Sequence, residues 1–315
     1  MIEVTGLKKR YGSFEAVRGV SFTVGAGRIV GLLGPNGAGK TSILKALTGF
    51  HRPSEGTVIL NGIDVDEDPV AVKACVGYLP EGVPLYMDMT VGEYMSFVAE
   101  ARKLPADGRM ASIDKAVRSC GLAGMEDVLI DHLSKGYRQR VGLAQAIVHD
   151  PAILILDEPT TGLDPNQIIE IRSLIRSLGE KKTVILSTHI LQEVEALCSE
   201  VLILNEGYIV AQGSAAKLAE EMKGDEKIEC VLKGADARTI ATLVNLKGLT
   251  VIGTDVVDSD RTNVSLRAAT GQGDQAAETL FDWAVGAGAK ILEMRRERPS
   301  LEDVFVRLTG EEAKR

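Results

Sequence analysis

The sequence predicts an α/β fold for roughly the first 220 residues, a mostly parallel sheet covered by helices, followed by a small α+β domain. In the first part, short β-branched runs alternate with helical stretches, which is the pattern of a parallel sheet with helices on its faces. Between Thr90 and His132 the pattern becomes helical, so we expect a helical insert on the side of this core. After the polar segment Glu220–Lys227, the order of predicted elements becomes that of a ferredoxin-like domain.

The strands of the first part are expected at its apolar, β-branched runs. Two opening runs, Ile2–Tyr11 and Val20–Val24, carry their own turns and predict an antiparallel flap. In the helical insert, Thr90 and Glu93 fit a capping box ahead of apolar residues at helical spacing. The expected core strands are Arg28–Leu33, Val76–Leu79, Ile153–Asp157, Thr183–Ser187 and Val201–Leu204.

The C-terminal part predicts strand, helix, strand, strand, helix and strand, which is the split βαβ arrangement. A helix capped by Ser214 and stopped by Gly224 is expected before it. A last helix, Leu301–Leu308, is expected after it. The expected elements are Ile228–Leu232, Ala237–Asn245, Leu249–Val257, Thr262–Arg267, Gln275–Ala287 and Lys290–Arg295.

The amino-acid composition argues against several classes of function and structure. The 315 residues carry 44 acidic and 36 basic side chains, a net charge of −8, which gives no overall attraction to nucleic acid. The four cysteines include no CxxC pair and the four histidines are scattered, so neither a zinc site nor a disulfide framework is expected. No apolar run approaches the roughly 20 residues that a membrane helix needs.

A glycine-rich loop stands between a predicted strand and a predicted helix and satisfies GxxxxGK[ST]. Its glycines let the backbone turn tightly, so that successive N–H groups point at phosphate oxygens, and the helix start adds partial positive charge. We expect Lys40 to bridge the β- and γ-phosphates and Thr41 to bind Mg²⁺. A glycine-rich turn that only packs is the alternative. The predicted nucleotide-binding residues are Gly34, Pro35, Asn36, Gly37, Ala38, Gly39, Lys40, Thr41 and Ser42.

An apolar strand that ends in two acids predicts the second half of a nucleoside-triphosphate site. Asp157, at the carboxyl end of that strand, is expected to hold Mg²⁺, and Glu158 to polarise the attacking water as a general base. By itself such a strand is a weak signal, because acids often end buried strands. Together with the glycine-rich loop it is a strong one.

Three more segments follow in a characteristic order. Leu133–Arg140 begins the helix before the Asp157 strand, Thr161–Asp164 follows Glu158, and Ser187–His189 closes the next strand. From Ile2 to about Gly213 the chain resembles the nucleotide-binding subunit of ABC transporters. The resemblance implies a P-loop NTPase fold for residues 1–223, with the helical subdomain at about 86–140. Residues 224–315 are then an accessory domain, for which we expect a dimer-supporting or regulatory role.

Site residues follow from the same resemblance. Ser134 and Gly136 belong to the stretch that answers to the family's LSGGQ signature, so the resemblance implies that they face the γ-phosphate bound by another protomer. That requires a dimer enclosing two ATP, formed by two copies or by this chain and a similar subunit. Asp164 answers to the D-loop, His189 to the switch histidine at the γ-phosphate, and Tyr11 resembles the aromatic residue that stacks on adenine. Each assignment has a purely structural alternative: a capped helix start for the signature, a packed or surface histidine for His189, and a half-buried tyrosine for Tyr11.

The sequence departs from the family pattern in two places. Lys135 and Tyr137 replace the commonest Gly and Gln of the signature, while Ser134 and Gly136 keep the phosphate contact. Glu81 stands where the family usually has Gln. Glu81 is then a Mg²⁺-shell ligand, which we favour, or it faces the membrane partner, or it has no role.

The segment Gly77–Met89 and the tail Pro299–Phe305 resemble the type-two exporter branch, which includes drug-export and gliding-motility subunits. The implied function is an ATP-hydrolysing motor that drives a separate transmembrane permease, with the chain cytoplasmic and peripheral on the inner face of the membrane. No nucleic-acid partner is expected.

A soluble ABC ATPase of the repair, chromosome or translation kind is the alternative, but the long coiled coils, zinc-binding cysteines or tandem cores of those proteins are absent. A nucleotide kinase or GTPase is contradicted by the signature and Asp164.

Overall fold

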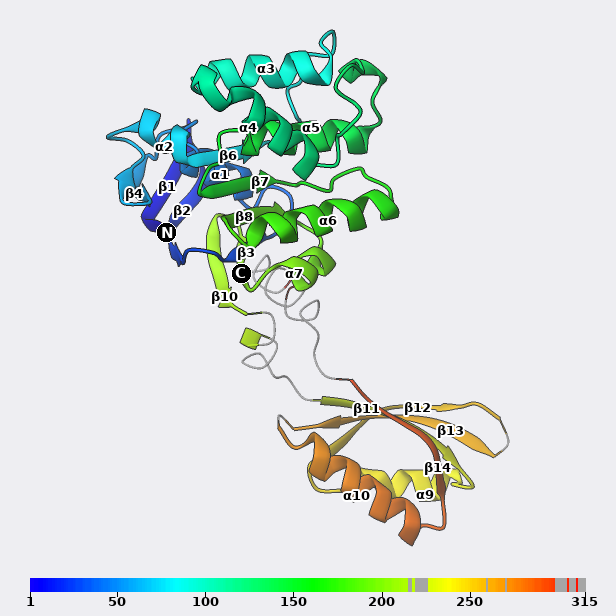
Figure 1. Ribbon diagram of the computed structural model, residues 1–315. Helices are drawn as coiled ribbons and strands as arrows, with labels where there is room; N and C mark the ends of the chain where they lie inside the picture. Colours follow the sequence, from blue (N-terminus) through cyan, green and yellow to red (C-terminus); the bar gives the residue numbers. More distant parts are fainter. Residues whose placement is uncertain are drawn as a thin grey trace. The chain divides into compact units, whose positions relative to one another are not determined.

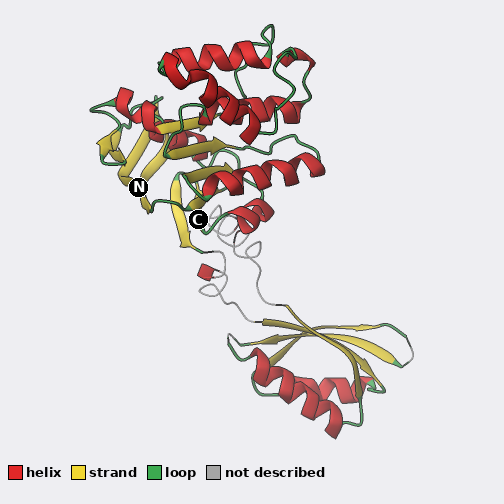
Figure 2. Cartoon of the chain, in the orientation of Figure 1, coloured by secondary structure: helices red, strands yellow, loops and turns green. Residues whose placement is uncertain are grey.

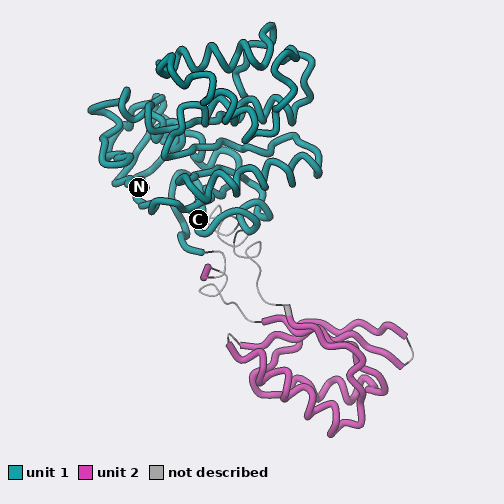
Figure 3. The backbone as a smooth tube through the Cα atoms, in the orientation of Figure 1, with its two compact units in different colours: residues 1–215, 308–315 teal, residues 216–307 magenta. Residues whose placement is uncertain are grey.

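A computed structural model of the protein describes residues 1–214, 226–258, 260–269 and 271–297, together with Lys217, Leu218, Phe305 and Gly310. The chain divides into two compact units, with Met1–Ala215 in the first and Ala216–Arg307 in the second (Figure 3). The boundary expected at residue 224 falls outside the described residues, between this division and the first strand of the second unit. The two helices expected at Ser214–Met222 and Leu301–Leu308 lie largely outside the described residues as well.

A six-stranded sheet forms the centre of the first unit, in the order β10-β9-β3-β8-β7-β6 (Figure 1). The five strands from β9 to β6 are parallel, and only β10 at the edge is antiparallel. The prediction of a mostly parallel sheet is therefore confirmed. The bounds are β3 Ile29–Leu33, β6 Val76–Leu79, β7 Ile153–Asp157, β8 Thr183–Thr188, β9 Glu200–Asn205 and β10 Tyr208–Gly213.

A second sheet, antiparallel and ordered β2-β1-β4-β5, contains the expected opening flap. Its strands are β1 Ile2–Tyr11, β2 Phe14–Val24, β4 Glu55–Leu60 and β5 Ile63–Asp64. The prediction for β2 was too short, because the strand begins at Phe14, which pairs with Tyr11 directly across the turn. Pairing of Phe14–Val17 with β1, with shifts in register along the way, extends β2 beyond the run that the sequence indicated.

Both faces of the six-stranded sheet are buried, which explains the continuous apolar runs of its strands. On β7, Ile153 and Ile155 pack into one core with α1 and the antiparallel sheet. Leu154 and Leu156 point to the other side and pack with α5, α6 and the helical insert. The helices of this part are α1 Lys40–Leu47, α2 Pro69–Cys75, α5 Lys135–Ile147, α6 Pro165–Gly179 and α7 Leu191–Leu197 (Figure 2).

The helical insert is confirmed as α3 Val91–Ala101 and α4 Ala106–Ser119, followed by the 3-10 turn Ile130–His132. The capping box is present, because the Thr90 hydroxyl accepts from the Glu93 N–H and the Glu93 carboxylate accepts from the Thr90 N–H. Tyr94 and Met95 face the core, and this burial rather than local propensity holds α3 in place.

The second unit has the order of elements that the sequence predicted. Its four-stranded antiparallel sheet runs β12-β13-β11-β14, the strand order of the split βαβ arrangement. Alternate residues of β11, Ile228, Cys230 and Leu232, are buried in its own core. The elements are β11 Glu226–Lys233, α9 Ala237–Ala241, the 3-10 turn Thr242–Asn245, β12 Leu249–Val256, β13 Arg261–Ala268, α10 Gly273–Gly286 and β14 Lys290–Glu297.

Candidate nucleotide-binding site

The order of the parallel strands places the chemistry-bearing segments side by side. Strands β3, β8, β7 and β6 are consecutive neighbours, so their carboxyl ends lie along one edge of the sheet. The glycine-rich loop follows β3, Asp157 ends β7, His189 follows β8, and Glu81 comes shortly after β6. Ligand sites of open α/β sheets lie at this edge.

Two positions of the loop accept no side chain. Gly39 has φ 104°, and a Cβ atom there would lie 2.5 Å from the carbonyl oxygen of Ala16. A Cβ atom on Gly34 would lie 2.6 Å from the carbonyl oxygen of Leu204. The loop therefore needs glycine at both ends, and it leads directly into the N-terminus of α1, a position that favours a phosphate group.

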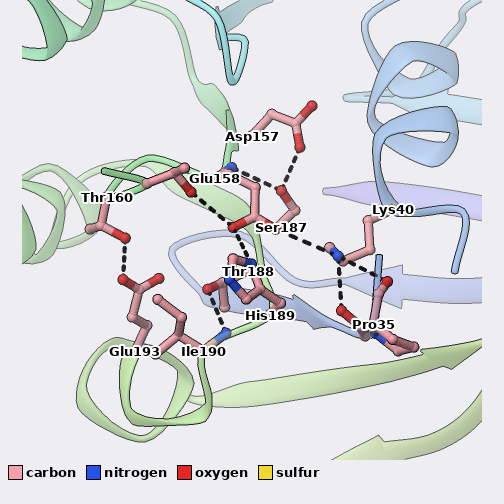
Figure 4. Close-up of polar contacts among 12 residues, drawn as sticks. Pro35, Lys40, Asp157, Glu158, Thr160, Ser187, Thr188, His189, Ile190 and Glu193 are labelled. Carbon is pink, nitrogen blue, oxygen red and sulfur yellow. Dashed lines mark hydrogen bonds and ion pairs between the residues drawn. The ribbon is translucent and has the colours of Figure 1, made fainter. Parts of the chain in front are cut away.

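Lys40, the first residue of α1, is buried and turns back over the loop. Its Nζ donates to the carbonyl oxygens of Gly34 at 2.8 Å and Pro35 at 3.2 Å. The same ammonium lies 3.5 Å from the Oε1 atom of Glu158 (Figure 4). A cation at this point neutralises negative charge that enters the loop.

Asp157 is 1% exposed, and one of its oxygen atoms accepts hydrogen bonds from two hydroxyl groups. Its Oδ1 atom accepts from the Ser187 hydroxyl at 2.6 Å and from the Thr41 hydroxyl at 3.3 Å. Burial raises the pKa of Asp157 above its usual range, and these two hydrogen bonds partly offset that effect. The contact with Thr41 joins the two segments that the sequence reading assigned to Mg²⁺.

Glu158 is held in a sparsely populated backbone conformation, with φ 48°. Its N–H donates to the Ser187 hydroxyl at 3.0 Å, which keeps the peptide at the end of β7 next to β8. The carboxylate contacts His189 Nδ1 at 2.9 Å, and accepts from the Thr161 hydroxyl at 3.3 Å (Figure 4). A glutamate with these neighbours is well placed to receive a proton from water.

A cleft of about 520 Å³ is lined by Lys40, Thr41, Glu158 and His189, and Asp157 lies behind it, bonded to Thr41. It includes the two positions that the sequence reading left most open, Tyr11 and Glu81, although both lie far from the loop in sequence. Tyr11 is 42% exposed, its ring edge-on to His51 at 5.8 Å between centroids. The lining residues are Tyr11, Phe14, Ala16, Asn36, Gly37, Gly39, Lys40, Thr41, Ser42, Glu81, Glu158, Thr161 and His189.

The donor set suits a nucleoside triphosphate with Mg²⁺. The volume falls in the usual range for small-molecule sites, and the polar groups converge at the loop end while the aromatic rings of Tyr11 and Phe14 stand on the β1–β2 hairpin. Within the described part of the chain, no three His, Cys, Asp or Glu side chains gather to hold a metal ion by themselves. Mg²⁺ does not require such a group, because it is usually held by one or two carboxylates together with phosphate oxygens.

Several predicted site residues do not line this cleft. Gly34, Pro35 and Ala38 belong to the phosphate loop that borders it, and Asp157 adjoins it through its hydrogen bond with Thr41. The other three, Ser134, Gly136 and Asp164, belong to separate segments. Ser134 caps α5, its hydroxyl accepting from the Tyr137 N–H, and Asp164 caps α6 by accepting from the Gln167 N–H at 3.0 Å. Gly136 is buried beside Gln167, where a Cβ atom would lie 2.7 Å from the Gln167 Cδ atom. Within one chain, Ser134 and Asp164 therefore act as helix caps, and none of the three lines the cleft at the phosphate-binding loop.

Sequence reasoning missed four residues of the site. Phe14 and Ala16 line the cleft from β2, and Thr161 lines it from the turn after Glu158. Ser187 joins Asp157 to the Glu158 backbone. The aromatic Phe14 after the Tyr11-Gly12-Ser13 turn was a usable signal for the first, and Ser187 had already been singled out in Ser187-Thr188-His189 without a role.

The fold and this site define a P-loop nucleoside triphosphatase. The family described as ABC transporter matches residues 17–161. Over 99% of its length the chain is 33% identical to the Nod factor export ATP-binding protein I of Rhizobium meliloti (strain 1021), covering 89% of that protein. It is also 33% identical to a daunorubicin resistance ATP-binding protein of Streptomyces coeruleorubidus, over 99% of this chain and 96% of that protein.

Solved structures agree with this relationship. The structure of an ATP-binding subunit of an ABC transporter is 30% identical, with a TM-score of 0.64 over 70% of this chain and 92% of the other. A dimeric ABC transporter cassette at 23% identity shares the fold, with a TM-score of 0.62 over 68% of this chain and 98% of the other. The chain belongs to the ABC transporter ATP-binding family, and it binds and hydrolyses ATP.

Proposed function

We propose that this chain is the motor subunit of an ABC exporter, which closes as a dimer around two ATP and drives a separate transmembrane permease. The observation that carries the proposal is the division of the predicted site residues. One set lines a single cleft or adjoins it, Asp157 through its hydrogen bond with Thr41, whereas Ser134, Gly136 and Asp164 belong to other segments and do not line that cleft of the same chain. A second protomer that brings these three residues to the nucleotide accounts for both sets.

Within the cleft, Glu158 acts as the general base and His189 orients it and contacts the γ-phosphate. Their contact of 2.9 Å supports this pairing, because a base held in one orientation abstracts a proton more effectively. Lys40 neutralises the phosphates. Thr41 and Asp157, with Glu81 as a further oxygen ligand, would hold Mg²⁺, which would lower the charge repulsion between these acids and the triphosphate.

Export is supported by the relatives, whose names describe Nod factor export and daunorubicin resistance. Among the described residues no helix is long and apolar enough to cross a membrane. In the proposed assembly, a separate permease chain spans the membrane. The motor then works at the cytoplasmic face of the membrane. The ferredoxin-like unit lacks the motifs of the nucleotide site, and we assign it a regulatory or dimer-supporting role.

Purification of the native complex tests the exporter role. We expect a hydrophobic membrane protein to copurify with this chain and to raise its ATPase activity. Recovery of the chain with DNA-repair or ribosomal proteins would instead favour the soluble alternative.

The adenine contact gives a first prediction. Tyr11→Ala is expected to weaken ATP binding about tenfold, since loss of a ring under a base costs roughly 1–3 kcal/mol, while Tyr11→Phe keeps near wild-type affinity. Titration with a fluorescent ATP analogue measures both. Phe14→Ala, which removes the other exposed ring of the cleft, and Tyr208→Ala, which removes an exposed ring outside it, are the comparisons. If only Phe14→Ala weakens binding, Phe14 is the stacking residue.

Glu81 gives a second prediction, because its carboxylate adds negative charge to a cleft that already holds Glu158. If it is a metal ligand, Glu81→Gln leaves Mg²⁺-free nucleotide binding unchanged or slightly stronger but shifts the Mg²⁺ dependence of hydrolysis. Steady-state ATPase rates over a Mg²⁺ titration measure this. Superimposed titrations of the variant and the wild type, with reduced stimulation by the permease, would assign Glu81 to the membrane partner instead.

A further inference from the structure

A buried glutamate outside the nucleotide cleft contacts the turn that carries the general base. Glu193 lies on α7 and is 0% exposed. Its Oε1 atom accepts a hydrogen bond from the Thr160 hydroxyl, and Figure 4 shows the two side chains pointing toward each other. Arg172 of α6 forms an ion pair with the same oxygen atom, at 3.9 Å from its Nη2 atom.

This arrangement is incomplete for a buried carboxylate. Within the described residues, Glu193 Oε2 and Arg172 Nε are both buried and have no hydrogen-bond partner. A buried ion pair that is only partly satisfied adds little to stability, and apolar residues of similar volume usually serve a core equally well. Stability alone therefore does not account for a glutamate here, and Thr160 is its closest partner.

Thr160 and Glu193 each lie a few residues after a residue of the candidate site. Thr160 stands in the turn between Glu158 and Asp164, next to Thr161, whose hydroxyl donates to the Glu158 carboxylate. Helix α7, which carries Glu193, begins at Leu191, two residues after His189. One carboxylate thus joins the turn after the general base to the helix after the histidine, and Arg172 extends the link to α6, which Asp164 caps.

We propose that Glu193 is a positioning residue, which through Thr160 holds the turn after Glu158 against α7 and so sets the geometry between Glu158 and His189. This inference rests on the proposed role of Glu158 as the base. Glu193 is not among the residues that line the nucleotide cleft, and its hydrogen bond goes to Thr160. It acts on turnover through the placement of the base and leaves the phosphate-binding loop as it is.

The sharpest test removes one hydroxyl. Thr160→Val has nearly the same shape but cannot donate to Glu193, whereas Thr160→Ser keeps the hydroxyl. In the full-length chain, we expect Thr160→Val to lower kcat about 10–100-fold, the effect of a small misplacement of a catalytic group, with the Kd for ATP within about twofold of wild type. Thr160→Ser is expected to keep kcat within about threefold of wild type.

A matched control comes from the exposed side of α6, where Glu170 pairs with Arg140. Glu170→Gln removes a carboxylate from that helix and is expected to leave kcat unchanged. Thermal unfolding of every variant shows whether the folded state survives. If Thr160→Val does not fold, Glu193→Gln against Glu193→Ala decides, because the amide oxygen of Gln still accepts from Thr160 and the methyl group of Ala does not.

Three outcomes overturn the inference. The first is a Thr160→Val variant with the kcat of wild type. The second is a Thr160→Ser variant that loses as much kcat as Thr160→Val. The third is a loss of ATP affinity with kcat preserved. Glu158→Gln, assayed beside them, separates this inference from the function on which it rests. An inactive Glu158→Gln with a fully active Thr160→Val removes only the role of Glu193, whereas an active Glu158→Gln removes the base itself.

Discussion

Replacing Glu158 with glutamine is expected to lower ATP turnover by about 10²–10⁴-fold while ATP still binds. The amide has nearly the same size as the carboxylate and occupies the same place beside His189 and Lys40, but it cannot take a proton from water. ATP that binds without being hydrolysed is expected to hold two copies together. Size-exclusion chromatography with ATP and Mg²⁺, together with a steady-state ATPase assay, measures both effects.

Glu195 supplies the control for this substitution. It is an exposed glutamate on α7, and Glu195→Gln removes the same charge from the helix that follows His189. Its turnover should match that of wild type. A Glu158→Gln variant that hydrolyses ATP at nearly the wild-type rate would exclude Glu158 as the base. A variant that stays monomeric with bound ATP would contradict the proposed dimer.

Replacing Lys40 with alanine is expected to weaken ATP binding about 10²–10⁴-fold, since each hydrogen bond to a charged group is worth roughly 1.5–3 kcal/mol and the proposed contact joins one ammonium to two phosphates. Loss of its ammonium also leaves the Glu158 carboxylate without the cation 3.5 Å away, which adds repulsion toward the triphosphate. Isothermal titration with ATP and Mg²⁺ measures the affinity. Turnover at saturating ATP is expected to fall as well.

Lys45 is the matched control, because it lies in the last turn of the same helix, with its ammonium 6.0 Å from the centre of the Phe50 ring. Lys45→Ala removes one positive charge from α1 without touching the lining of the cleft. Equal losses of affinity in the two variants would show that overall charge, and not contact with phosphate, explains the result.

Many residues of the site could be predicted from the sequence because the motifs that contain them are short and continuous. The glycine-rich loop, the apolar strand ending in Asp157 and the capping box at Thr90 each lie within a few consecutive residues, and backbone geometry at short range sets their structure. The strand order of the second unit was likewise implied by a simple succession of periodic segments.

Other features of the site depend on residues far apart in the chain. Thr41 and Asp157, which share a hydrogen bond, are 116 positions apart, and Glu193 is 33 positions from Thr160. No local pattern encodes such pairs, because the order β3-β8-β7-β6 that brings them together results from the burial of whole strand faces. The start of β2 at Phe14 was missed for the same reason, since pairing with β1 sets its length.

The sequence by itself determined that this chain binds a triphosphate and which residues belong to the phosphate loop and the acidic strand end, since short segments of fixed spacing specify both. Only the tertiary structure decided that Tyr11, Phe14 and Glu81 share a cleft with that loop, and that Ser134, Gly136 and Asp164 lie outside it. The physical reason is that a side chain's chemistry belongs to its residue type, whereas its neighbours are set by the packing of sheet and helices into two buried cores.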